Sequence, residues 1–170
     1  MSNLDNLGNV LIRSDLNVPI KNGVITDNFR IIKSAEIVEK IFKKSKTITF
    51  TSHMGRPEGK DLNLSLRPVA KSMEDILGKK VHFIDEVYGE KVEKQIEKSE
   101  FKIFLLENLR FEKGEIGNDH NFSKQITKPF NSYIFDAFGA AHREHASVVS
   151  FGENLDSFQK ILKILKNDLN

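Results

Sequence analysis

The chain has 170 residues, of which 39% are hydrophobic and 29% are charged, and its formal net charge is +2. This length suits one domain with a sizeable core, and the composition is that of an ordinary soluble globular protein. The absence of cysteine excludes disulfides and thiolate chemistry. Because the sequence shows neither a secretory signal nor an apolar run of membrane length, we expect a cytoplasmic protein without a membrane partner. The small net charge gives no reason to expect a nucleic-acid partner.

Five short apolar segments are the predicted strands. Each is rich in β-branched residues and mostly continuous, which is typical of strands that are covered on both faces. In chain order they are Val10 to Leu16, Thr47 to Ser52, Val81 to Ile84, Lys102 to Leu106 and Ser132 to Phe138.

Amphipathic stretches between these strands are the predicted helices. The first carries apolar residues from Ile31 to Phe42 at helical spacing, with Asp27 placed as its N-cap. The second is marked by Val69, Met73, Ile76 and Leu77 before Gly78, the third runs from Val87 to Lys98, and a fourth lies around Phe122 and Ile126 before Pro129. The alternation of strands and helices predicts a three-layer, Rossmann-like α/β sandwich with a mainly parallel sheet.

We expect residues 1–150 to form this α/β domain. In residues 151–170, one helical face carries Leu155, Phe158, Leu162, Leu165 and Leu169. This segment is either a last helix that docks on the sheet or a helix that lies against a partner or a further domain.

The placement of the arginines suggests a function. Of 26 basic residues only six are arginine, and four of these, Arg30, Arg56, Arg110 and Arg143, follow predicted strands. In an open parallel sheet, ligands bind beyond the carboxyl ends of the strands, where these loops gather. Because the guanidinium group suits bidentate contact with phosphate or carboxylate, the pattern predicts a site for a small, multiply charged anion.

Polar residues at the ends of the first two strands refine this prediction. Asp15 and Asn17, two residues apart, can accept hydrogen bonds from hydroxyl groups, and His53 can donate to an anion. A phosphorylated hydroxy acid fits this combination. Arg30 in the first turn of a helix is opposed by the helix dipole, which marks either a site or a surface ion pair with Asp15 or Asp27.

Other candidate sites receive less support. Arg13 lies inside the first strand, where a buried structural pair is expected. His142 and His145 have no third ligand at zinc-like spacing, and neither GxGxxG after a strand nor GxxxxGK[ST] is present. We therefore expect no metal site.

The sequence resembles the N-terminal domain of the phosphoglycerate kinase family from about Val10 to Val149. The resemblance is carried, in the family's order, by VLIRSDLNVPIKNGVITDNFRI, SHMGRPEGK, LSLRPVAKSMEDILGKKVHF, LLENLRFEKGE and YIFDAFGAAHREHAS. Five ordered motifs at fitting distances are far more specific than one short pattern.

This resemblance implies 3-phosphoglycerate as the substrate. Asp15 and Asn17 would bind its hydroxyl and carboxylate end, and the backbone at Met54 and Gly55 would shape the pocket. Arg30 would reach the carboxylate and stabilise the phosphoryl group during transfer, which makes it the implied catalytic residue. The residues implied to surround the phosphate are His53, Arg56, Arg110 and Arg143.

The family continues into a second α/β domain that binds Mg-ATP or Mg-ADP, and this sequence stops before it. We therefore expect the chain to supply the substrate-binding half, to bind no nucleotide or metal itself, and to need a nucleotide-binding half in trans for turnover. The alternative is a non-catalytic anion-binding or regulatory protein derived from that domain. An aspartyl phosphatase with Asp15 as nucleophile fits poorly, because Asn17 stands where that chemistry needs a second acid.

Overall fold

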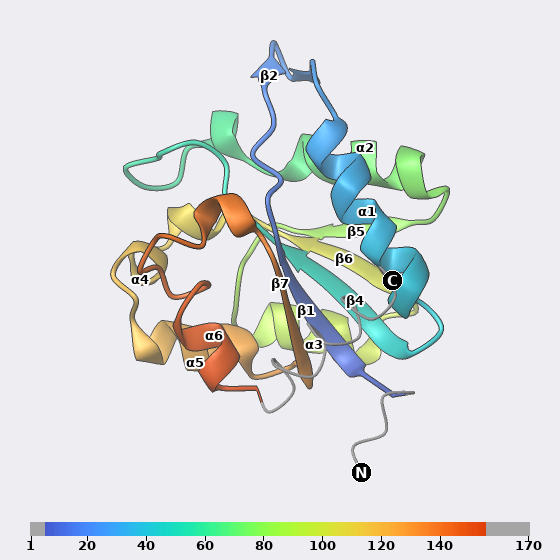
Figure 1. Ribbon diagram of the computed structural model, residues 1–170, viewed down its shortest axis with the longest axis vertical. Coiled ribbons are helices and arrows are strands. Elements are labelled where there is room, and N and C mark those ends of the chain that lie inside the picture. The colour runs from blue at the N-terminus through green and yellow to red at the C-terminus, as the bar shows by residue number, and fades with distance from the viewer. Residues whose placement is uncertain (1–5, 156–170) are drawn as a thin grey trace.

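The computed structural model describes residues 6–155, and these form a three-layer α/β sandwich (Figure 1). Five parallel strands pair in the order β5-β6-β4-β1-β7. Their bounds are β1 Gly8–Ser14, β4 Ser45–Thr51, β5 Val81–Ile84, β6 Ile103–Leu106 and β7 Ser132–Asp136. The predicted fold class and all five predicted strands are confirmed.

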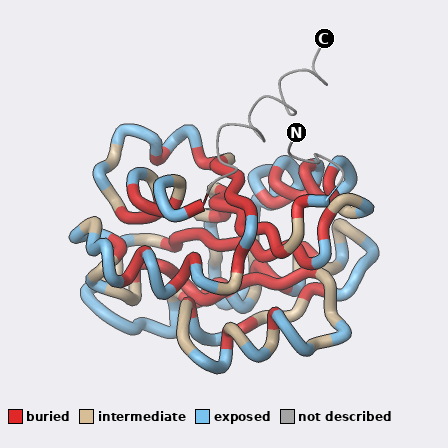
Figure 2. Tube along the Cα trace, turned by 90° about the horizontal axis from the view of Figure 1, so that it is seen from below, coloured by how far each residue is buried: buried red, intermediate tan, exposed pale blue. Residues whose placement is uncertain are grey.

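Helices cover both faces of the sheet and divide the core in two (Figure 1). The first core lies under α1 (Phe29–Ile41) and α2 (Arg67–Leu77), and the second under α3 (Glu90–Lys98), α5 (His120–Thr127) and α6 (Ser150–Glu153). Strand β1 feeds both cores, because Val10 and Ile12 point to the first and Leu11 to the second. Figure 2 shows the buried residues concentrated along the strands and the inner sides of the helices.

The helix boundaries differ from the prediction at two N-termini. The N-cap of α1 is Asn28 rather than Asp27, whose carboxylate instead accepts a hydrogen bond from the Phe29 amide at 2.9 Å. Helix α3 begins at Glu90 instead of Val87, because the chain passes through a positive φ of 101° at Gly89 before it turns helical. The predicted end of α2 at a left-handed Gly78 is confirmed.

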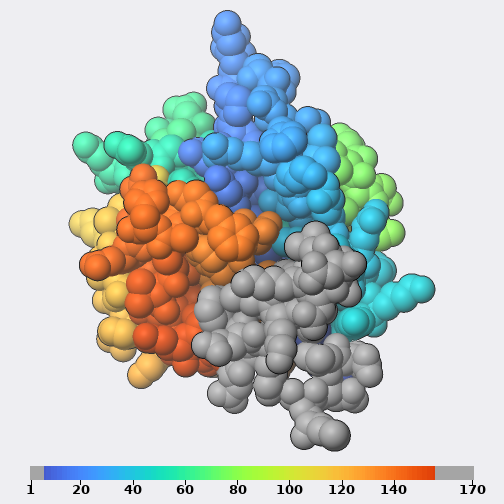
Figure 3. All heavy atoms as spheres, viewed as in Figure 1, coloured from blue at the N-terminus to red at the C-terminus, as the bar shows by residue number. Residues whose placement is uncertain are grey.

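Short elements complete the described chain. A hairpin of β2 (Ile20–Lys21) and β3 (Val24–Ile25) projects from the body of the molecule (Figure 3). Helix α4 spans Lys113–Ile116, and the 3-10 turns are η1 Leu62–Leu64, η2 Leu109–Phe111 and η3 Phe138–Ala140.

The segment expected to form a C-terminal amphipathic helix lies largely outside the described residues. Of its first residues, which are described, Phe151 in α6 and Leu155 after it lie in the second core. The domain boundary near residue 150 stays a prediction. No helix within residues 6–155 is long and apolar enough to cross a bilayer.

Candidate anion-binding site

The loops after β1, β4, β6 and β7 meet at one edge of the sheet because these strands are parallel neighbours. Ser14 at the end of β1 pairs with Asp136 at the end of β7. The next loop brings Gly139 so close to Asp15 that a Cβ added at Gly139 would lie 3.6 Å from an Asp15 carboxylate oxygen. In Figure 3 the orange surface of the chain around β7 accordingly meets the blue surface of the chain after β1.

Three of the four predicted arginines line one cavity of about 260 Å³ at this edge, which we call the arginine pocket. Its walls are Arg56, Pro57, Arg110, Ile116, Arg143 and His145. Burial lowers the pKa of Arg110, and the charges of Arg143 and Arg13 lower it further. The pocket therefore concentrates positive charge whose self-repulsion a bound anion would relieve.

Arg30 does not line this pocket. Its guanidinium donates to the Asp15 carboxylate at 3.0 Å and to the Asn17 carbonyl at 3.1 Å. This is the surface ion pair that the sequence left open, and it offsets the unfavourable position of a cation at a helix N-terminus. Arg30, Asp15 and Asn17 thus form a second polar cluster.

Gly55 connects the two clusters. Its amide donates to the Asn17 side-chain oxygen at 3.0 Å, and its carbonyl accepts from Arg110 at 2.6 Å. Gly55 has a φ of 61°, a left-handed conformation that favours glycine, whereas an added Cβ would only push aside the end of the Leu64 side chain, 2.9 Å away. The backbone at Gly55 therefore sets the spacing between the clusters.

Asn108 is a site residue that the sequence reasoning missed. It is fully buried, and its side chain accepts from the Met54 amide at 3.1 Å and donates to the Met54 carbonyl at 2.8 Å. Its side-chain oxygen also accepts from the Arg110 amide at 3.1 Å. Its position two residues before Arg110, in the ENLR stretch, could have pointed to it. Asn108 holds the loop after β4 against the loop after β6.

His53 and Arg13 are buried neighbours, and neither lines the arginine pocket. The Arg13 guanidinium lies 2.9 Å from His53 Nδ1 and also donates to the Ser147 hydroxyl at 2.9 Å. Ser147 in turn donates to the carboxylate of Glu115 at 2.6 Å. The buried pair expected for Arg13 is therefore with Glu115, and the Ser147 hydroxyl bridges the two side chains. Hydrophobic periodicity could not predict this partner, because it is far away in the sequence.

His145 is a second residue that the sequence reasoning missed, because it was considered only as a metal ligand. It lines the arginine pocket, and its Nδ1 is 3.8 Å from the Glu115 carboxylate. Burial lowers its pKa, and Arg110 and Arg143 lower it further, while Glu115 opposes them.

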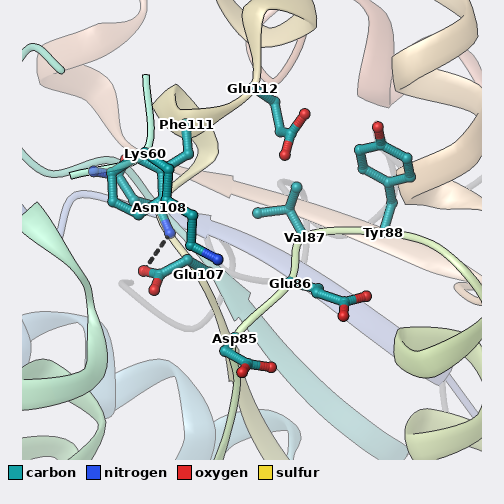
Figure 4. A pocket seen from close by; sticks show the side chains of 9 residues that line it. All are labelled: Lys60, Asp85, Glu86, Val87, Tyr88, Glu107, Asn108, Phe111 and Glu112. Carbon is teal, nitrogen blue, oxygen red and sulfur yellow. Dashed lines mark hydrogen bonds between the residues drawn. The ribbon is translucent and has the colours of Figure 1, made fainter. Parts of the chain in front are cut away.

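A different cavity, of about 300 Å³, has the opposite charge (Figure 4). Its lining includes the carboxylates of Asp85, Glu86, Glu107 and Glu112, and one lysine, Lys60. Glu107 uses its carboxylate internally, where it accepts from Ser65 at 2.8 Å and from the Asn108 amide at 2.8 Å. This cavity does not suit an anion.

Asp136 gives the site edge a pH-dependent stability. Burial raises its pKa to about 6, with Asp15 and Glu36 contributing. A raised carboxyl pKa favours folding when the group is protonated, so this contribution is lost as the pH rises through 6. We expect Asp136→Asn to raise the thermal midpoint at pH values well above that pKa, with the advantage vanishing near the ordinary Asp pKa of about 4. Thermal denaturation across this range checks the prediction, the exposed Glu58→Gln is the control, and an advantage that does not depend on pH would contradict it.

Comparison with known proteins gives one consistent result. The family model for phosphoglycerate kinase matches residues 3–164. The phosphoglycerate kinase of Wolbachia sp. subsp. Drosophila simulans (strain wRi) is 44% identical over 150 residues, which cover 88% of this chain and 38% of that protein. That of Dictyoglomus turgidum is 41% identical over 154 residues, with 90% and 39% covered.

Solved structures agree. The phosphoglycerate kinase structure from Coxiella burnetii aligns with a TM-score of 0.74 at 35% identity, covering 90% of this chain and 38% of that one. The structure from Pyrococcus horikoshii OT3 aligns with a TM-score of 0.76 at 26% identity, covering 96% and 43%. The present chain spans less than half the length of the relatives it matches.

Proposed function

Because the chain belongs to the phosphoglycerate kinase family, we propose that it supplies the 3-phosphoglycerate-binding half of such a kinase in the cytoplasm. The observation that carries this proposal is the arginine pocket, in which Arg56, Arg110 and Arg143 arrive from three separate loops. Three guanidinium groups around one small cavity match a doubly charged phosphate in charge and in hydrogen-bond geometry.

The cluster of Asp15, Asn17 and Arg30 receives the other end of the substrate. Asp15 accepts a hydrogen bond from the hydroxyl group, and Arg30 binds the carboxylate. Arg30 is half-exposed and held by two hydrogen bonds in the free chain, so a substrate carboxylate can share its remaining donors. With the phosphate in the arginine pocket, Gly55 separates the two charged ends of the ligand.

In the family, a phosphoryl group passes between the nucleotide and the substrate carboxylate, and the Mg-nucleotide chemistry belongs to the second domain. Within residues 6–155, no group of three or more acidic or histidine side chains is placed to hold a metal ion. This chain contributes position and positive charge, with Arg30 stabilising the group in transfer. A nucleotide-binding half, closing over the substrate, would supply the rest.

Titration of 3-phosphoglycerate into the ¹⁵N-labelled chain tests the proposal. We expect amide shifts at Gly55, Arg56, Arg110 and Arg143, and affinity about tenfold or more above that for glycerate, which lacks the phosphate. Sulfate at matched ionic strength is the control for unspecific anion binding. If these amides do not shift at millimolar 3-phosphoglycerate, or if glycerate binds equally well, the proposed function is refuted.

A further inference from the structure

The contact between Arg13 and His53 determines which ring nitrogen of the histidine carries the proton. Arg13 Nη2 lies 2.9 Å from His53 Nδ1. A guanidinium group has five N–H donors and no acceptor, so Nδ1 must accept this hydrogen bond. An accepting Nδ1 places the single hydrogen of the neutral ring on Nε2.

Arg13 has little freedom to adopt another arrangement. Its side chain is 1% exposed, and besides His53 it donates to the Ser147 hydroxyl at 2.9 Å and to the Ser14 carbonyl at 2.5 Å. The Ser147 hydroxyl must then donate onward, and it does so to Glu115 at 2.6 Å. The Ser147 amide donates to the other Glu115 oxygen at 3.0 Å, which holds this hydroxyl in place.

A protonated His53 is incompatible with these surroundings. An imidazolium would direct an Nδ1–H at the guanidinium of Arg13, so the hydrogen bond would be lost and two positive charges would face each other. Arg110, Arg143 and His145 also act on the ring, while burial removes it from water, and together these effects lower its pKa to about 3, burial being the largest. His53 therefore stays neutral throughout the physiological range.

We propose that Arg13 is a positioning residue that fixes His53 as a neutral Nε2–H donor to the anion, with Glu115 orienting Arg13 through Ser147. His53 then offers the anion a hydrogen bond that does not depend on pH, beside arginines that supply the charge. The identity of the anion rests on the proposed function, whereas the tautomer does not and is measured in the free chain.

Nuclear magnetic resonance of the ¹⁵N-histidine-labelled chain tests the tautomer directly. We expect His53 to show a protonated Nε2 and an unprotonated Nδ1, without titration between about pH 5 and 8, where an ordinary histidine titrates. Arg13→Lys, which also offers only donors at this position, should retain this signature. The Arg13→Met/Glu115→Gln double variant removes both buried charges together, and it should show mixed tautomers and a His53 that titrates.

Binding of 3-phosphoglycerate provides the second readout. In the double variant we expect affinity at pH 7 to fall by about tenfold, the value of one hydrogen bond to a charged group, and to become dependent on pH. Arg13→Lys should keep most of the affinity that the double variant loses. Unchanged chemical shifts of His82, which contacts Gln95, verify in each variant that the fold is intact.

A protonated Nδ1, a mixture of tautomers, or ordinary titration of His53 in the unmodified chain would overturn the inference. An unchanged His53 signature in the double variant would also overturn it, because Arg13 would then not be the cause. A fixed Nε2–H tautomer in a chain that does not bind 3-phosphoglycerate would support the role of Arg13 and refute the proposed function.

Discussion

Replacing Glu115 with alanine is expected to lower the free energy of unfolding by about 3–5 kcal/mol, the typical cost of leaving a buried charge without its partner. Glu115 is fully buried and accepts hydrogen bonds from both the amide and the hydroxyl of Ser147. Through that hydroxyl it balances the guanidinium of Arg13. Its loss also removes two of the hydrogen bonds that hold the loop after Arg143 and His145. Urea denaturation of the purified chain measures the effect.

Two variants separate the contributions of Glu115. Glu115→Gln keeps an oxygen that can accept one of the two hydrogen bonds but removes the charge, so it should fall between the wild type and Glu115→Ala. Glu58→Ala, on an exposed loop, should change stability by less than about 0.5 kcal/mol. A loss in Glu115→Ala no larger than that of the surface control would show that Arg13 does not need this carboxylate.

Replacing Arg143 with methionine is expected to weaken 3-phosphoglycerate binding by about 10- to 100-fold without lowering stability. The binding loss corresponds to one charge-assisted contact worth about 1.5–3 kcal/mol. The free energy of unfolding should stay the same or increase, because the positive charge of Arg143 repels that of Arg110 in the same pocket. Arg143 also forms no ion pair among the described residues that its loss would break. Calorimetric titration and thermal denaturation of the same preparations measure both effects.

Arg67→Met is the matched control for Arg143→Met. Arg67, the first residue of α2, carries the same charge as the partly buried Arg143 but is exposed. Its guanidinium lies 4.6 Å from the centroid of the Phe83 ring and does not line the arginine pocket. It should leave the binding constant unchanged. If both variants weaken binding equally, the effect is one of net charge, and the assignment of Arg143 to the phosphate is wrong.

The fold was predictable because its determinants are local. Apolar runs of strand length alternate with amphipathic helical stretches along the chain. In each segment, the apolar residues of the pattern are those that the structure buries in one of the two cores. The left-handed Gly78 ended its helix as expected, since glycine is favoured in that conformation. The starts of α1 and α3 were placed less well, because neighbouring polar residues and glycines compete for the N-cap position.

The sequence by itself determined that the chain is a parallel α/β domain and that scarce arginines follow its strands. The tertiary structure decided how these arginines divide, with Arg56, Arg110 and Arg143 in one pocket and Arg30 bound to Asp15. It also decided the roles of Asn108 and of Arg13, whose partners lie 54 and 134 residues away. Periodicity reports which face of an element is buried, but hydrogen-bond partners depend on the distances between elements, which exist only once the chain is folded.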